Sequence, residues 1–95
     1  MNFPNNDYLT FSIDAKNPVN LTFPNKKPKK IWLDAQINSS FRLKFNNDDK
    51  DGMLIHMSSS TQKNFKIPST VNSISISTTI DTTFFITLLV EEWGN

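Results

Sequence analysis

Cysteine is absent from the 95-residue chain, which excludes disulfide bonds and thiolate metal ligands. Glycine occurs only at Gly52 and Gly94, too sparsely for a glycine-rich phosphate loop. His56 is the only histidine, and we predict that it is an outward-facing strand residue rather than a catalytic one. No apolar run approaches the roughly 20 residues that span a membrane. We therefore expect no enzymatic activity, no cofactor and no small-molecule substrate.

The abundant residues favour β-structure. Ile, Val, Thr, Phe, Tyr and Trp fill 32 of the 95 positions, and these branched and aromatic side chains suit a pleated, half-buried surface. Ala and Glu, which favour helices, occur only twice each. The net charge of +1 gives no general argument for nucleic-acid binding. We expect neither nucleic acid nor a membrane as a partner.

Apolar and polar residues alternate with a period of two along almost the whole chain. Polar turns separate the alternating segments, which predicts about eight short strands without helices between them. This pattern indicates a single antiparallel β-sandwich, jelly-roll or immunoglobulin-like, over residues 1–95, with residues 1–7 as an N-terminal arm. The lysine-rich run 25–30 is expected to be an extended, solvated loop. The expected strands are 9–13, 19–23, 31–37, 41–45, 53–57, 65–67, 71–77 and 83–91.

The last predicted strand breaks the simple alternation. Its even-numbered residues from 84 to 90 are apolar and share one face, but Phe85 and Leu89 lie on the other face. Such a strand is either a central one that a loop partly covers, or part of an interface with another subunit or partner. Trp93 follows, and tryptophan is enriched at binding hot spots. Residues 1–7 are polar apart from Phe3, and we predict that Phe3 docks on a neighbouring subunit. Phe3, Phe85, Leu89 and Trp93 are thus the candidate protein interface.

Two segments suggest ligands. Trp32, Asp34 and Gln36 occupy the polar face of the strand 31–37, where an exposed aromatic ring with carboxylate and amide neighbours would suit a carbohydrate. The run 47–52 resembles the opening of a calcium loop, but its twelfth position is Ser58, where a bidentate Glu is required. We interpret it as a hairpin turn with Gly52 at positive φ, so no metal ligand is assigned and calcium binding there stays open.

From Lys30 to Trp93 the order of strands and turns resembles a known group of proteins. The segments are Lys-Ile-Trp-Leu, Phe-Arg-Leu-Lys-Phe, an acidic turn with glycine, Met-Leu-Ile, Phe-Lys-Ile-Pro, Ile-Ser-Ile and Phe-Ile-Thr-Leu-Leu-Val-Glu-Glu-Trp. This order is similar to that of small β-sandwich virion proteins of tailed bacteriophages, such as head-decoration, cement or fibre-base subunits. The resemblance implies a subunit without a catalytic centre that docks on a capsid or tail surface, often as an oligomer.

The resemblance also implies a location. The first residues lack the basic start and apolar stretch of a secretory signal, so we expect synthesis in the host cytoplasm and assembly into the virion. The expected partners are other virion proteins, further copies of the chain, or both. Two alternatives stay open: a carbohydrate-binding module and a phage-encoded inhibitor of a host protein.

Overall fold

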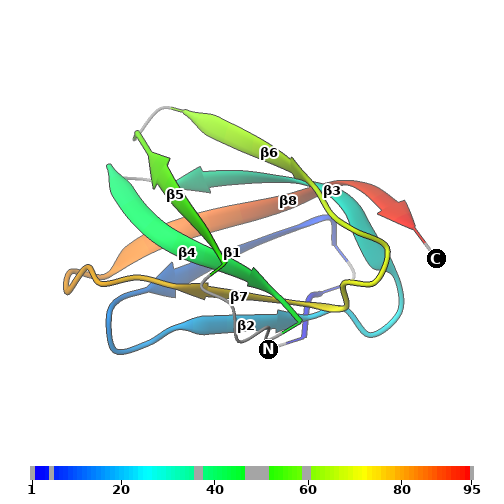
Figure 1. Ribbon diagram of the computed structural model, residues 1–95, viewed down its shortest axis with the longest axis horizontal. Helices are drawn as coiled ribbons and strands as arrows, with labels where there is room; N and C mark the ends of the chain where they lie inside the picture. The colour runs from blue at the N-terminus through cyan, green and yellow to red at the C-terminus, as the bar shows by residue number, and fades with distance from the viewer. Residues whose placement is uncertain (1, 5, 36–37, 47–51, 59–60, 95) are drawn as a thin grey trace.

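The computed structural model of the chain describes residues 2–4, 6–35, 38–46, 52–58 and 61–94. Eight strands form two four-stranded sheets (Figure 1), and no helix occurs among these residues. The predicted all-β sandwich is therefore confirmed. The strands are β1 (Tyr8–Ile13), β2 (Val19–Thr22), β3 (Lys27–Ala35), β4 (Ser39–Phe45), β5 (Met53–Met57), β6 (Gln62–Lys66), β7 (Ser73–Ser77) and β8 (Phe84–Gly94).

The strand order distinguishes between the two topologies that the sequence left open. One sheet, called here the β8 sheet, has the order β1-β8-β3-β6, and the other, the β7 sheet, has the order β2-β7-β4-β5. All the pairings are antiparallel. The first four strands thus pair with the last four in reverse order, β1 with β8 through to β4 with β5. This winding, eight strands in two sheets, is that of a jelly roll rather than of an immunoglobulin domain.

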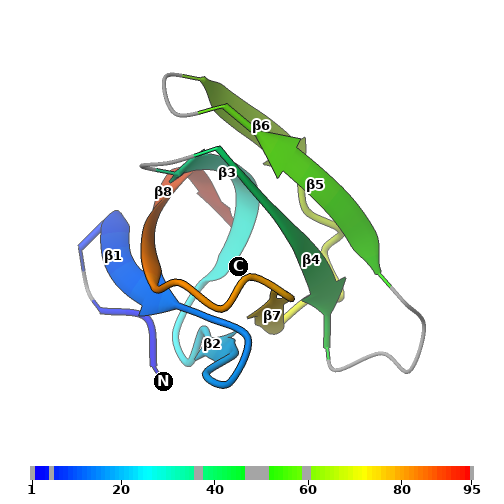
Figure 2. The same cartoon turned by 90° about the vertical axis from the view of Figure 1, so that its left-hand side faces the viewer.

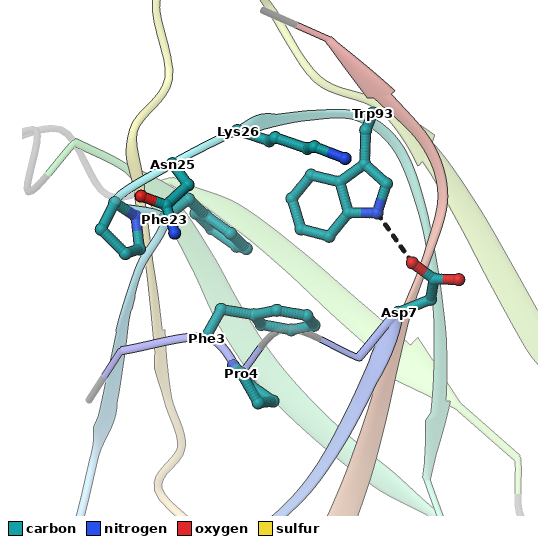
Figure 3. A pocket seen from close by; sticks show the side chains of 8 residues that line it. Phe3, Pro4, Asp7, Phe23, Asn25, Lys26 and Trp93 are labelled. Atoms are coloured by element: carbon teal, nitrogen blue, oxygen red, sulfur yellow. Dashed lines mark hydrogen bonds between the residues drawn. The ribbon is translucent and has the colours of Figure 1, made fainter.

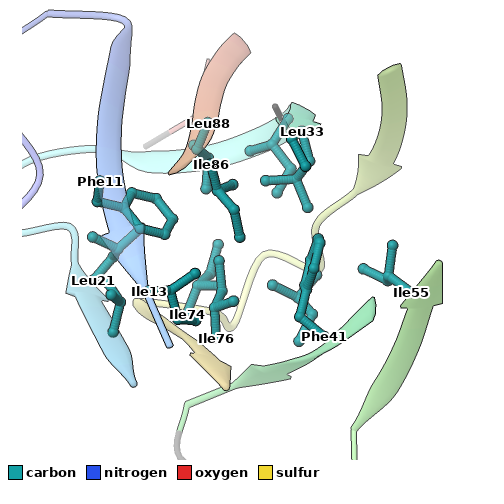
Figure 4. Close-up of a cluster of buried hydrophobic side chains, with 14 of the residues drawn as sticks. Phe11, Ile13, Leu21, Leu33, Phe41, Ile55, Ile74, Ile76, Ile86 and Leu88 are labelled. Atoms are coloured by element: carbon teal, nitrogen blue, oxygen red, sulfur yellow. The ribbon is translucent and has the colours of Figure 1, made fainter. Parts of the chain in front are cut away.

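The core lies between the two sheets. Figure 2 views the sandwich from one end, and Figure 4 shows side chains from both sheets meeting in the space between them. The period-two alternation explains this arrangement, because every second residue of a strand points to the same face. Fully or almost fully buried side chains on the inner faces include Phe11, Ile13, Leu21, Leu33, Phe41, Ile55, Ile74, Ile76, Ile86 and Leu88.

The lysine-rich run differs from its prediction. Residues 25–30 were expected to form a solvated loop, but residues from Lys27 onwards belong to β3 and Pro28 is fully buried. The reason is long-range pairing, since Lys27 lies opposite Gly94 and Pro28 opposite Trp93 on β8. The register shifts between Pro28 and Ile31, and such irregularities are where a sheet tolerates proline.

The turn from β1 to β2 depends on Asp14. Its Oδ1 accepts hydrogen bonds from the backbone N–H of Lys16 and from Asn17 Nδ2, both at 2.9 Å. Its Oδ2 accepts one from Thr83 Oγ1 at 3.0 Å, which ties the turn to the start of β8. These bonds, that of Lys16 foremost, hold the pKa of the Asp14 carboxyl below its ordinary value. The carboxylate therefore fixes a connection between the two sheets.

The predicted hairpin of β4 and β5 is confirmed, and the residues on either side of its turn, Asn46 and Gly52, both have a positive φ. Asn46 closes β4 with a φ of 56°, and its side chain donates to Thr70 O and accepts from the backbone of Asn72, both at 2.8 Å. Gly52 has a φ of 74°, as expected for its place before β5. The suggested calcium ligands in the run 47–51 lie outside the described residues.

The two faces of β8 predict a contrast between neighbouring leucines. Leu88→Ala should lower the free energy of unfolding by about 2–5 kcal/mol, because Leu88 is fully buried and its truncation leaves a cavity. Leu89→Ala should change it by less than about 1 kcal/mol, because Leu89 is 41% exposed. Urea unfolding of both variants measures the contrast. Equal losses would contradict the assignment of the two faces.

Candidate interaction surface

Among the described residues, most of the exposed large apolar side chains lie on the β8 sheet, on the side away from the core. Tyr8 on β1 is 58% exposed, and Phe85 and Leu89 on β8 are 46% and 41% exposed. We call the outward-pointing side chains of this sheet the outer face. They are Tyr8, Thr10 and Ser12 on β1, Phe85, Thr87 and Leu89 on β8, Trp32 and Asp34 on β3, and Gln62 and Asn64 on β6.

One row of residues crosses the outer face from edge to edge. Tyr8 lies opposite Leu89, Leu89 opposite Trp32, and Trp32 opposite Asn64. Neighbouring strands are about 4.8 Å apart, so Tyr8 and Trp32 flank Leu89 within about 10 Å of each other. Because these three side chains are adjacent, they form a continuous apolar strip rather than scattered exposed residues.

Polar side chains border this strip on one side. Thr87 pairs with Asp34, and Asp34 pairs with Gln62, in the next row of the sheet. Together with Tyr8, Trp32 and Leu89 they line a hollow of about 270 Å³. An apolar strip with a few polar groups beside it can bind another surface and also orient it.

The side chain of Trp32 is held in place by its neighbours. Its Nε1–H donates to Glu91 Oε2 at 2.6 Å, and Lys30 Nζ lies 3.2 Å from the same oxygen. The bond from Trp32, and secondarily the Lys30 ammonium, hold the pKa of the Glu91 carboxyl below its ordinary value of 4.5. Because the indole N–H is already bonded, Trp32 is oriented before any partner arrives.

Phe85 and Leu89 therefore share the outer face, as their position in the sequence predicted. β8 is a central strand between β1 and β3, which was one of the two interpretations. The loop that this interpretation placed over the two side chains is not found among the described residues, because both stay more than two-fifths exposed. That these residues bind another protein remains a prediction.

Phe3 lies elsewhere, and its predicted docking on a neighbouring subunit is wrong. Its ring is only 6% exposed and packs on Phe23 and Trp93 of its own chain, with ring centroids 5.2 Å and 5.8 Å away (Figure 3). The N–H of Phe3 donates to Thr22 O at 2.8 Å, which ties the N-terminal segment to β2. The aromatic ring is buried within the chain, so it is not available to a second subunit.

Trp93 belongs to the same aromatic cluster. It is half-buried, its centroid lies 6.2 Å from that of Phe23, and its Nε1–H donates to Asp7 Oδ1 at 2.9 Å. A hollow of about 280 Å³ opens beside the cluster, with Lys26 and Pro4 at its rim (Figure 3). The contacts of Trp93 anchor the N-terminal segment to the end of β8, and its predicted place in a protein interface stays a prediction.

The remaining candidates are placed as follows. Trp32 and Asp34, suggested for a carbohydrate, lie on the outer face, whereas Gln36 lies outside the described residues. His56 is exposed on β5, as predicted. Among the residues that the structure describes, no group of three or more histidine, aspartate or glutamate side chains could hold a metal ion.

Tyr8 is the residue that sequence reasoning missed. It is the most exposed of the large hydrophobic residues and stands at one end of the apolar strip. A signal was present, because Leu9, Phe11 and Ile13 were assigned to the inner face. The same alternation turns Tyr8 outward.

No family model matches this chain, and comparisons with curated proteins and with solved structures find no significant match. Among the described residues there is also no helix of the length and apolar character needed to cross a membrane.

The bond between Trp32 and Glu91 predicts that the indole fluorescence reports the protonation of the Glu91 carboxyl. In a Trp93→Phe background, the fluorescence of Trp32 should change with a midpoint below 4.5, because the folded-state pKa of Glu91 is lowered. The interaction is present above that pKa and is lost as the pH falls through it. Lys30→Met should raise the midpoint, and Glu91→Gln should abolish the transition. A midpoint unchanged by Lys30→Met would contradict the role of the ammonium.

Proposed function

We propose that this protein is a non-enzymatic interaction subunit that docks on another protein through the outer face of the β8 sheet. The observation that carries the proposal is the apolar strip of Tyr8, Leu89 and Trp32, in which Tyr8 and Leu89 are exposed and Trp32 is half-buried. The exposed ring of Phe85 lies on the same face, beyond Thr87. Tyrosine and tryptophan are enriched among the residues that dominate the binding energy of protein interfaces.

The proposed setting is a bacteriophage particle, in which the chain is a decoration, cement or fibre-associated subunit. Two observations support this setting. The strand order from Lys30 to Trp93 resembles that of such subunits, and the eight-stranded jelly roll is an architecture of viral capsid proteins. Both are fold-level analogies, so the proposal depends on the apolar strip for its chemistry.

The electrostatics of the outer face suit a neutral protein surface. Lys30 and Glu91 form an ion pair at the border of the apolar strip, and the outer face also carries one charge of each sign, Asp34 on β3 and Lys66 opposite Lys30 on β6. The face therefore has no strong excess of one sign that would select nucleic acid. Its ion pair belongs to the border, where charges steer a partner more than they add affinity.

Co-sedimentation tests the proposal. The chain should travel with assembled particles in a density gradient of lysate from the cells that make it. Leu89→Lys should release most of it, because a charge would be buried in the contact. Asn20→Lys is the matched control, since Asn20 is exposed on β2 in the other sheet and its substitution should leave the chain on the particle. A chain that never enters the particle fraction, or Leu89→Lys that remains there, would refute the proposal.

A carbohydrate is the second candidate, and one observation favours it. Trp32 and Tyr8 line the 270 Å³ hollow together with Asp34, Gln62 and Thr87, which offer hydrogen-bond partners to hydroxyl groups. Calorimetric titration with cello- and chito-oligosaccharides discriminates the two functions. A heat of oligosaccharide binding that disappears in Asp34→Ala would favour the sugar. Binding to the particle that is retained in Asp34→Ala but lost in Leu89→Lys would favour the protein partner.

A further inference from the structure

The edges of the two sheets differ in how far they are protected from further strand pairing. β6, the edge of the β8 sheet, carries Lys63 and Lys66 on five residues, and lysines discourage edge-to-edge pairing. On the opposite side of the sandwich, the N-terminal segment lies beside β1 and β2 (Figure 2), with Asn2 bridged to Thr22. These three edges are charged or partly screened.

β5, the last strand of the β7 sheet, has neither protection. Its sequence Met-Leu-Ile-His-Met contains no lysine, carboxylate, proline or glycine, and Met53 and Leu54 are 39% and 52% exposed. Among the described residues, only β4 pairs with it. An uncharged apolar strand at an edge is a template for pairing with another strand.

The hydrogen-bond pattern shows which groups of β5 face the open edge. The N–H of Asn46 donates to Ser73 O, so the even-numbered residues of β4 direct their backbone groups to β7. The odd-numbered residues of β4 then direct theirs to β5, where their partners are Met53, Ile55 and Met57. The N–H and C=O groups of Leu54 and His56 consequently point to the open edge, where no described residue pairs with them.

We propose that β5 pairs antiparallel with β5 of a second copy of this chain, about a two-fold axis at Ile55. Leu54 of each copy then lies opposite His56 of the other, and these residues exchange four backbone hydrogen bonds. The two β7 sheets join into one continuous eight-stranded sheet. This contact is separate from the outer face of the β8 sheet, so it does not depend on the proposed function.

The occupant is a second copy because β5 is complementary to itself in this register. The side chains of opposed residues fall on the same face, so Ile55 meets Ile55 and the exposed Met53 meets Met57 on the core side. Leu54 meets His56 on the solvent side, and no like charges oppose each other along the strand. A two-fold contact requires this self-complementarity.

The contact is short, which sets its expected strength. Five residues span about 17 Å, and contacts of this size lie at the small end of protein interfaces. We expect a monomer–dimer equilibrium that depends on concentration. Light scattering should show the mass rising from 10.9 kDa towards twice that value as the concentration reaches the millimolar range.

Because the chain contains no cysteine, disulfide trapping can test the register directly. Leu54→Cys and His56→Cys are made separately, since both side chains are exposed and neither substitution disturbs the core. When the two variants are mixed and oxidised, they should form a cross-linked heterodimer, because opposed residues lie about 5.5 Å apart at Cα. Each variant alone should cross-link about ten-fold less, since its own copies lie about 8 Å apart, beyond disulfide range.

A matched control measures random collisions. Gln62→Cys mixed with Asn64→Cys has the same spacing on the lysine-protected edge strand β6 and should give only background cross-linking. Equal cross-linking in the two mixtures, or a wild-type mass of 10.9 kDa at every concentration, would overturn the proposal. Adding Leu89→Lys to the Leu54→Cys and His56→Cys variants should leave their cross-linking unchanged. Loss of particle binding and loss of self-pairing are therefore separate outcomes.

Discussion

The pairing of β8 with both β1 and β3 is the constraint on which the rest of the structure depends. β8 is the longest strand, and its inner side chains Phe84, Ile86, Leu88 and Val90 are all buried. By pairing on both sides it brings the two ends of the chain into one sheet, and it also holds Trp93 where Phe3 and Phe23 pack on it. Both partners of β8 lie far from it in the sequence, and its pairing with β1 is the outermost pair of the nested order of the jelly roll.

The strands could be predicted from sequence because their alternation is a local property. The hairpin of β4 and β5 was predictable for the same reason, since its partners are neighbours along the chain. The start of β3 was not, because Lys27 and Pro28 become strand residues only through their pairing with the end of β8. The choice of a jelly roll also depends on pairings between distant strands, which a period-two pattern does not encode.

The candidate site shows the same difference between what a local pattern predicts and what depends on distant contacts. Phe85 and Leu89 were identified because an apolar residue on the polar face breaks a local rule, and the structure places both on an exposed face. Phe3 was misassigned because its partners, Phe23 and Trp93, are distant in sequence, and a lone phenylalanine in a polar segment resembles an anchor for another subunit. Tyr8 was missed because the expected strand began at Leu9, although the alternation of Leu9, Phe11 and Ile13 places Tyr8 on the outer face.

Among the described residues, the outer face of the β8 sheet and the edge strand β5 both expose apolar side chains but differ in kind, which is why different partners are proposed for them. On the outer face of the β8 sheet the backbone of β8 is already paired on both sides, so only side chains such as Leu89 can make contacts, and any complementary surface can meet them. At β5 the backbone itself is open, so the partner must be an extended strand whose side chains match in register. A strand identical to β5 satisfies that condition without any other protein. The jelly roll thus places the surface proposed for a foreign partner and the edge proposed for a second copy on different sheets.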